Sequence, residues 1–545
     1  MLAYQPPYGT FWPTAIYREA YYRSYQLALK KLKVRSELLF FSSEMTIPPK
    51  WYQFLVGLFA SIGSFNYGYD LGIIAQVVAS DSFVAKFSPS DNEKGLVVSL
   101  FTAGAFCGSF FAGYLGDWVG RRGTIAIATA TFILGGGLQA GGQNIGFLQA
   151  GRFVAGIGVG VLCMIIPLYQ AELAHPTIRG RITALQQFML GIGALCASWI
   201  GFGAYKGFAP TDDNQWRVPL AIQCVPAAIL GLLIFLFPES PRWLIDNGQV
   251  NLGLKTLAKL HAHGNENDPW VRAEFEQIQE QITHEHEHSA KTWGELFKNK
   301  SNFRRIFLCV ALQSSIQLTG VSAIQYYSPD IFKQIGVSTE RTLLYQACNS
   351  IVALVGQFLC ILFIDQFGRR WPLIFGNLGN CVTFIVGAIL LALFPPGKDN
   401  PMSAQIGFIA TTWIYNFSFS ATCGPLSWII PSEVFNTATR SRGVSLATMM
   451  SFAMNTMIGQ VTPIAMTNIG WKYYILFIVC NFTNAIFFWA LLPETAKVPL
   501  EAMDNLWENA PWFVPTMESK DYLGDLRERE LEIDNKQAIN IDHKE

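Results

Sequence analysis

Two short charged stretches decide the fold, and they are near copies of each other: Asp117-Trp118-Val119-Gly120-Arg121-Arg122 and Asp365-Gln366-Phe367-Gly368-Arg369-Arg370. Each stretch closes a long apolar run, and the two are 248 positions apart. Two further signatures repeat in the same order, namely Glu172/Arg179 with Glu433/Arg440, and Pro238-Glu239 with Pro493-Glu494. The repeats predict two halves of one design arranged in parallel, with a binding site between them.

The apolar runs around these signatures predict an all-α membrane protein. Charged residues, Gly and Pro bound twelve apolar runs of roughly 20 residues, the length that crosses a bilayer as a helix. The expected spans are 52–77, 95–115, 123–142, 149–171, 182–203, 218–237, 306–327, 343–364, 371–395, 405–430, 443–466 and 473–492. We therefore predict twelve transmembrane helices in two pseudo-symmetric six-helix bundles.

The same boundaries divide the chain into five parts. They are a cytosolic tail (1–50), a first bundle (51–238), a cytosolic linker with short amphipathic helices (239–305), a second bundle (306–492) and a cytosolic tail (493–545). Met45 immediately precedes the first span, so residues 1–44 are either a cytosolic extension or an artefact of the gene model.

The composition excludes several classes of protein. Hydrophobic residues make up 51% of the chain and charged residues 14%, whereas a soluble domain carries about 25% charged residues. The 39 Lys and Arg residues balance 39 Asp and Glu residues. These values exclude a soluble enzyme, a disordered chain and a nucleic-acid-binding protein.

The distribution of basic residues predicts the orientation. If both termini are cytosolic, the inner side carries 30 Lys and Arg residues and the outer side 8. The excess comes from the linker and the tails, because the short loops carry equal numbers on the two sides. The positive-inside rule therefore predicts a multi-pass protein of the plasma membrane with both termini in the cytosol.

Further motifs follow one another in a fixed order: Gly151-Arg152, Pro167-Leu168-Tyr169-Gln170-Ala171-Glu172, Pro238-Glu239-Ser240-Pro241-Arg242-Trp243-Leu244, Tyr326-Tyr327-Ser328-Pro329 and Pro493-Glu494-Thr495. Together with the repeats, this set resembles the sugar porter family of the major facilitator superfamily, in its fungal form, over about residues 51–505. The resemblance implies a carrier that rocks two bundles around a midplane cavity. No covalent chemistry and no cofactor are implied. The implied energy source is a proton gradient.

The resemblance also implies a gating role for the charged signatures. In the family, such residues latch the two bundles together on the cytosolic side while the site faces outward. The matching residues are Asp117, Arg121, Arg122, Glu172, Arg179, Asp365, Arg369, Arg370, Glu433 and Arg440, with Glu239 and Arg242 beside them. The alternative is that they only fix the topology, but carboxylates add little to that signal. Trp118 stands where many relatives have a basic residue, which predicts a looser first latch.

Asp70 lies in the middle of the first expected span, after Asn66-Tyr67-Gly68-Tyr69. A carboxylate inside a membrane marks a proton or ion pathway by default, because an unpaired charge there is costly. The resemblance implies that Asp70 pairs with Arg152 and that protonation of Asp70 releases the pair. The alternative is a permanent structural ion pair.

Buried amide and aromatic side chains are the candidates for a sugar site, because sugars present hydroxyl groups and apolar ring faces. By position in the family, or by their place on one helix face, we expect substrate contacts from Tyr67, Gln187, Gln313, Gln317, Ser322, Tyr327, Trp428 and Asn455. Gly320 is expected to interrupt the helix between Gln317 and Ser322. The alternative for each Gln, including the neighbouring Gln186, is a hydrogen bond that joins two helices.

Some positions depart from the family pattern. Ile316 and Ser322 replace a Gln and an Asn, and Ser451-Phe452 replaces Asn-Trp. Each change removes or shortens a hydrogen-bonding arm, and a lost partner commonly costs about 1–3 kcal/mol. The sequence therefore does not by itself establish a standard hexose site.

Two other patterns are given simpler explanations. Gly151, Gly156, Gly158 and Gly160 follow no strand, so close helix packing is expected rather than a nucleotide loop. His284, His286 and His288 alternate in the linker and diverge by about 200° on a helix, so no metal site is expected.

We therefore expect a secondary transporter that imports a monosaccharide, hexose or pentose, by proton symport. One alternative is a uniporter or a carrier of another polyol, such as an inositol or quinate. Another is a membrane sugar sensor that transports little; long cytosolic tails are typical of such sensors, and only 53 residues follow Leu492 here. The expected partners are a sugar, a proton and the lipid bilayer. The sequence indicates neither the particular sugar nor an oligomeric state.

Overall fold

The computed structural model describes residues 48–288, 297, 300–395, 400–435, 437–496, 506–507 and 511–515. Within these ranges, the side chains of residues 176–181, 183–184, 284–288, 365 and 437–441 lie outside what the structure describes. The histidines at 284, 286 and 288 belong to this group.

The first half of the molecule is a bundle of helices. It consists of α2 (Pro49–Ala60), α3 (Ile62–Ala79), α4 (Asp81–Phe87), α5 (Asp91–Val119), α6 (Arg121–Ala140), α7 (Ile145–Leu173), α8 (Pro176–Gly207), α9 (Asn214–Ile222), α10 (Cys224–Leu233) and the 3₁₀ turn η1 (Ile234–Leu236). Three further helices follow it, α11 (Pro241–Asp246), α12 (Val250–His261) and α13 (Pro269–His288).

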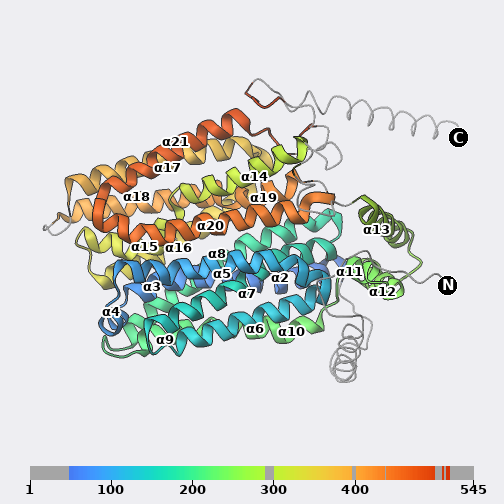
Figure 1. The fold of residues 1–545 in the computed structure, drawn as a ribbon, viewed down its shortest axis with the longest axis horizontal. Helices are drawn as coiled ribbons and strands as arrows, with labels where there is room; N and C mark the ends of the chain where they lie inside the picture. The colour runs from blue at the N-terminus through green and yellow to red at the C-terminus, as the bar shows by residue number, and fades with distance from the viewer. Residues whose placement is uncertain are drawn as a thin grey trace.

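The second half repeats the arrangement. It consists of α14 (Lys300–Leu318), α15 (Val321–Gln334), α16 (Thr339–Phe367), α17 (Arg370–Leu393), α18 (Met402–Ala421), α19 (Cys423–Val434), α20 (Thr437–Ile469), the 3₁₀ turn η3 (Gly470–Lys472) and α21 (Tyr473–Leu491). Figure 1 shows the two halves side by side, with α11, α12 and α13 beyond one end of the bundles. We call this end the linker end and the opposite one the distal end.

The architecture confirms the predicted twelve-helix, two-bundle membrane fold. Nine stretches of the described residues are long and apolar enough to cross a membrane, and one of them joins the eleventh and twelfth predicted spans. The first and tenth predicted spans are not among these nine, and each is interrupted in the structure, at Ser61 and at Thr422. The large apolar side chains exposed on the bundles include Leu232, Phe367 and Leu393, as expected for surfaces that face lipid.

Glycines bring α5 and α7 into close backbone contact. A Cβ atom at Gly156 would lie 2.0 Å from the carbonyl oxygen of Phe101, and one at Gly104 would lie 2.2 Å from that of Phe153. Gly108 on α5 and Gly160 on α7 continue the same contact. This is the small-residue packing expected for membrane helices, and it confirms that the glycine run serves helix packing.

The two halves meet mainly along α5 with α20, α8 with α16 and α3 with α15. At the distal end, Asp91 accepts a hydrogen bond from Thr467 (2.6 Å), and Lys206 forms an ion pair with Glu340 (2.5 Å). Further hydrogen bonds between the halves are Gln460–Asn92, Ser99–Gln460, Thr102–Thr456, Lys333–Ala79, Gln76–Leu343 and Ser445–Ser109. The distal end is therefore closed in this state.

Candidate functional site

An ion pair between Asp70 and Arg152 occupies the interior of the first half. Arg152 Nη1 lies 2.6 Å from each carboxylate oxygen of Asp70, and both residues are fully buried. Arg152 Nε donates to the carbonyl oxygen of Val97 (2.9 Å), and the guanidinium lies 4.4 Å from the centre of the Phe101 ring. The structure thus brings together the two residues that the sequence predicts as a proton-coupling pair.

The charges of Asp70 and Arg152 neutralise each other, but the hydrogen bonds of the Arg152 guanidinium are incomplete. Arg152 Nη2 is buried and has no hydrogen-bond partner among the described residues. Removal of one member of a buried ion pair typically costs about 3–5 kcal/mol, because the other charge stays buried without a counterion. Protonation of Asp70 would have the same electrostatic effect on Arg152, so it gives a proton a direct influence on the packing of α3 against α7.

The break in the seventh span places three polar groups together. Gly320 separates α14 from α15 with φ +92°, the left-handed region that favours glycine, so the predicted interruption is confirmed. Gln317 Nε2 donates to Ser451 Oγ (3.1 Å), and Ser322 Oγ donates to Gln317 Oε1 (2.7 Å). Two short hydroxyl side chains therefore orient the amide of Gln317.

Aromatic rings connect this polar group with the ion pair. The Tyr67 ring lies 5.9 Å from Phe452 of the second half and 6.4 Å from Phe101, which also contacts Arg152. Tyr326 and Asn455 of the second half are buried in the same region, where their side chains interact with each other. Polar side chains of both halves, Tyr67 and Tyr326, therefore lie close to the ion pair, so this central region is suited to a polar substrate.

The other predicted substrate residues have different surroundings. Gln313 donates to the carbonyl oxygen of Ser427 on α19 (2.8 Å), and Tyr327 Oη donates to that of Gly459 on α20 (2.7 Å). Gln187 and Trp428 are half-buried, on α8 and α19. Gln186 is engaged in a helix-to-helix hydrogen bond with Gln170 (2.6 Å). The substrate-binding roles remain predictions.

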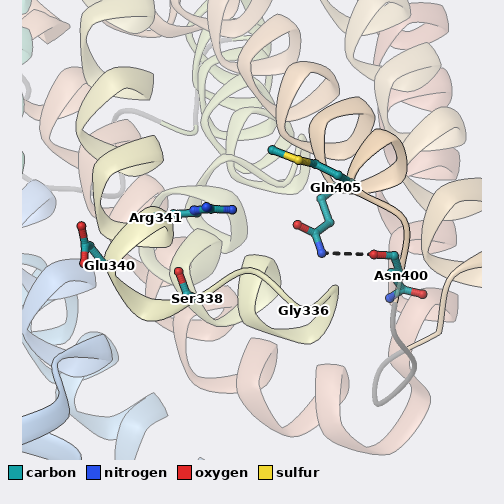
Figure 2. A pocket seen from close by; sticks show the side chains of 7 residues that line it. Gly336, Ser338, Glu340, Arg341, Asn400 and Gln405 are labelled. Carbon is teal, nitrogen blue, oxygen red and sulfur yellow. Dashed lines mark hydrogen bonds between the residues drawn. The ribbon is translucent and has the colours of Figure 1, made fainter.

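A separate cavity of about 640 Å³ lies near the distal end of the second half. Its lining, shown in Figure 2, consists of Gly336, Ser338, Glu340, Arg341, Asn400, Met402 and Gln405. Gln405 Nε2 donates to the carbonyl oxygen of Asn400 (3.4 Å). None of the predicted substrate residues lines this cavity.

A charged cluster lies at the linker end of the first half. Arg121 Nη2 and Nε each lie 2.9 Å from a carboxylate oxygen of Glu172, which makes a bidentate ion pair, and Arg121 Nη1 lies 3.3 Å from Asp117. Glu239 accepts hydrogen bonds from the backbone N–H groups of Arg121 (3.0 Å) and Arg122 (3.2 Å). Glu239 therefore caps the start of α6, where an anion is favoured.

The second half contains a matching cluster. Arg369 Nη2 lies 2.8 Å from Glu433, and Glu494 accepts from the backbone N–H groups of Arg369 (2.8 Å) and Arg370 (3.1 Å). Arg122 donates to the carbonyl oxygen of Phe235 (2.6 Å), and Arg370 donates to that of Trp489 (2.5 Å). Both carbonyl groups lie near the end of the last span of their half. The sequence reasoning did not assign a role to Glu494, although its repeat relation to Glu239 was the signal.

These described ion pairs each join residues of the same half. Arg242 is half-buried on α11. The side chains of Arg179, Asp365 and Arg440 lie outside the described residues, so their predicted gating roles stay predictions.

The Glu239 cap gives a direct prediction. Burial raises the pKa of Glu239, whereas the N–H groups that it accepts from oppose this shift. Glu239→Ala should destabilise the fold by about 2 kcal/mol, because a hydrogen bond to a charged group contributes about 1.5–3 kcal/mol. The midpoint of thermal unfolding in detergent measures the effect. Glu276→Ala, on an exposed face of α13, is the control, and equal midpoints would contradict the capping role.

Two repeated bundles around a buried ion pair, with matched charged clusters at one end, define a secondary membrane carrier rather than an enzyme. The chain belongs to the family described as "Sugar (and other) transporter", whose model matches residues 56–507.

Relatives and a solved structure agree with this family. The chain is 35% identical to the MFS-type transporter criB of Aspergillus cristatus, over 83% of this chain and 93% of the relative. It is 32% identical to the quinate permease of Emericella nidulans, over 88% of this chain and 92% of the permease. The structure of the proton:xylose symporter XylE bound to 6-bromo-6-deoxy-D-glucose matches with a TM-score of 0.70 at 26% identity, covering 84% of this chain and 99% of XylE.

Proposed function

We propose that this carrier imports a monosaccharide across the plasma membrane together with a proton, with both of its termini in the cytosol. The observation that carries the proposal is the buried Asp70–Arg152 pair, which lies close to Tyr67 of the first half and Tyr326 of the second. A carboxylate in such a place gains or loses a proton with a large effect on its partner. XylE, which has the same fold, is a proton:xylose symporter.

Alternating access follows from the contacts between the halves. The distal end is held by hydrogen bonds and an ion pair that cross between the halves, such as Thr467–Asp91 and Lys206–Glu340. At the linker end, the bidentate Arg121–Glu172 pair stays within one half. We propose that the distal end opens in the other state of the carrier, and that the charged clusters join the two halves when it does.

A second candidate is a carrier of a polyhydroxylated carboxylate such as quinate. Two observations favour it: Arg152 Nη2 has no partner among the described residues, and Ser322 and Ser451 are shorter than the amide side chains of the family at these positions. An arginine with a spare N–H group can bind a carboxylate. A relative of the chain is named a quinate permease.

Reconstitution into liposomes tests these functions together. The purified chain should take up radiolabelled glucose or xylose, and an inward proton gradient should drive accumulation above the outside concentration. Uptake of quinate but of no neutral sugar would favour the second candidate. Uptake that equilibrates and ignores the gradient would identify a uniporter, whereas binding without flux would identify a sensor.

If Gln317 and Trp428 bind the substrate, their replacement should lower the substrate affinity. Gln317→Ala with Trp428→Ala should raise the KM for the transported sugar at least tenfold, because about 1–3 kcal/mol is lost for each unmade hydrogen bond. Initial rates of uptake measure the effect. Gln186→Ala, which removes a helix-to-helix hydrogen bond, is the control. An unchanged KM in the double variant would place the substrate elsewhere.

A further inference from the structure

The break in the seventh span lies against two asparagines of α21. Asn481 and Asn484 are one helical turn apart and are 0% and 6% exposed. Asn484 Nδ2 donates to the carbonyl oxygen of Ser315 in the last turn of α14 (3.0 Å). Asn481 Nδ2 donates to the carbonyl oxygen of Thr319, which directly precedes Gly320 (3.1 Å). Two amides of one helix therefore supply hydrogen bonds to two backbone carbonyl groups at the break.

Two further helices hold the same break. Tyr415 on α18 donates from Oη to the carbonyl oxygen of Thr319 (3.2 Å). The N–H and the hydroxyl of Thr319 both donate to the carbonyl oxygen of Ile316 (3.3 Å and 2.7 Å), which tightens the last turn of α14. From α17, the Phe384 ring lies so close to Gly320 that a Cβ atom there would be 2.5 Å from it. The break is therefore in contact with α17, α18 and α21.

Carbonyl groups at a break need donors from outside their own helix. The last carbonyl groups of a helix have no intrahelical donor, and inside a membrane no bulk water replaces it. A continuous seventh span would satisfy the same oxygens from its own backbone, with the N–H of Ala323 reaching the carbonyl oxygen of Thr319. The side-chain donors on α18 and α21 therefore favour the broken form over the continuous one.

The broken form is what brings Gln317 and Ser322 together. Gln317 lies in the last turn of α14 and Ser322 in the first turn of α15. The hydrogen bond from Ser322 Oγ to Gln317 Oε1 (2.7 Å) crosses the break. On a continuous helix, residues five positions apart point about 140° away from each other. This hydrogen bond therefore depends on the break, and so does the orientation of the Gln317 amide.

We propose that Asn481 and Asn484 are positioning residues for substrate binding, which hold the seventh span in its broken form and so orient Gln317 toward the substrate. They act through the backbone of α14. The proposal rests on the proposed function, because that function places the substrate at Gln317. It adds two residues of the twelfth span to those on which the substrate affinity depends.

A double-mutant cycle in liposomes tests the proposal, with radiolabelled glucose as the probe. Asn481→Leu removes the donor and should raise the KM about tenfold, while the maximal rate stays within about twofold of the wild type. In a Gln317→Ala background, the same change should raise the KM less than about twofold, because no amide remains to be oriented. An unchanged KM in Asn481→Leu, or an equal rise in both backgrounds, would overturn the proposal.

The control is Asn380→Leu on α17. Asn380 is fully buried, and its side-chain amide has no hydrogen-bond partner among the described residues. This change removes a buried amide of the same bundle but no donor to the break, so the KM should equal that of the wild type. If Asn481→Leu does not fold, Tyr415→Phe removes the other donor to Thr319 and should raise the KM about threefold. An unchanged KM in that variant would then overturn the proposal.

Hydrogen–deuterium exchange of the full chain in lipid nanodiscs, without substrate, separates this proposal from the proposed function. In Asn481→Leu, the N–H groups of Ser322 and Ala323 should exchange about tenfold more slowly than in the wild type, because a continuous helix protects them. Equal or faster exchange would overturn the proposal. If the wild type takes up no glucose, the proposed function is not supported, and the exchange measurement decides the positioning role alone.

Discussion

Asp70→Asn should abolish accumulation of substrate against its gradient, a loss of at least a hundredfold in the ratio of inside to outside concentration. An amide cannot take up and release the proton that would link the gradient to movement of the two halves. It also leaves Arg152 buried without a counterion, which costs about 3–5 kcal/mol. Proton-driven accumulation in liposomes measures the first effect, and counterflow without a pH gradient shows whether the halves still move.

A double variant separates coupling from structure. Asp70→Asn with Arg152→Gln removes both charges, so no buried cation without a counterion destabilises the folded protein. We expect the yield of folded protein to recover while accumulation stays lost. Recovery of accumulation would show that the pair is only structural, and undiminished accumulation in Asp70→Asn alone would reject proton coupling through this residue.

Gly156→Val should prevent folding, with a yield of membrane-inserted protein below about a tenth of the wild type. The new Cβ would lie 2.0 Å from the carbonyl oxygen of Phe101, and a backbone atom cannot move aside as a side chain can. Overpacking commonly costs about 1–3 kcal/mol where side chains adjust; here α5 and α7 must separate. Yield by size-exclusion chromatography in mild detergent measures the effect.

The same helix pair provides the control. A Cβ atom at Gly113 on α5 meets nothing within 4 Å, so Gly113→Val changes helix propensity and lipid contact but no helix contact. Its yield should stay close to that of the wild type. Equal yields for both variants would contradict the close approach of α5 and α7.

Helix boundaries were predictable where the sequence dictates backbone geometry. Gly120 and Gly368, with φ of 86° and 79°, end α5 and α16 at the repeated charged stretches. In the span predicted over 405–430, α18 ends at Ala421, four residues before Pro425. Pro425 has no N–H group to donate to that carbonyl oxygen, and its ring excludes the contact.

The break in the first span could not be predicted, because its cause is a tertiary contact. Ser61 donates to the carbonyl oxygen of Gly57 (2.8 Å) and accepts from Gln170 of α7 (2.8 Å). Back-bonding of this kind bends helices. A lone Ser in an apolar run does not indicate it, because the partner lies 109 positions away.

Several residues of the site were predictable, but most of their partners were not. The repeats singled out Arg121, the intramembrane charge singled out Asp70, and the family resemblance implied Arg152 as the partner of Asp70. That Glu494 caps α17 as Glu239 caps α6, and that Asn481 and Asn484 reach the end of α14, depends on how separate helices dock. No local pattern of residues contains that information.

The line of side-chain contacts between α5 and α20 implies an order of events during opening. A tilt that parts the distal end stretches Thr467–Asp91 most and Ser445–Ser109 least, because the latter contact lies furthest along α5. Each such bond contributes only about 1 kcal/mol net. Opening of the distal end would then break these hydrogen bonds one after another. The free-energy barrier to opening would be divided into several small steps.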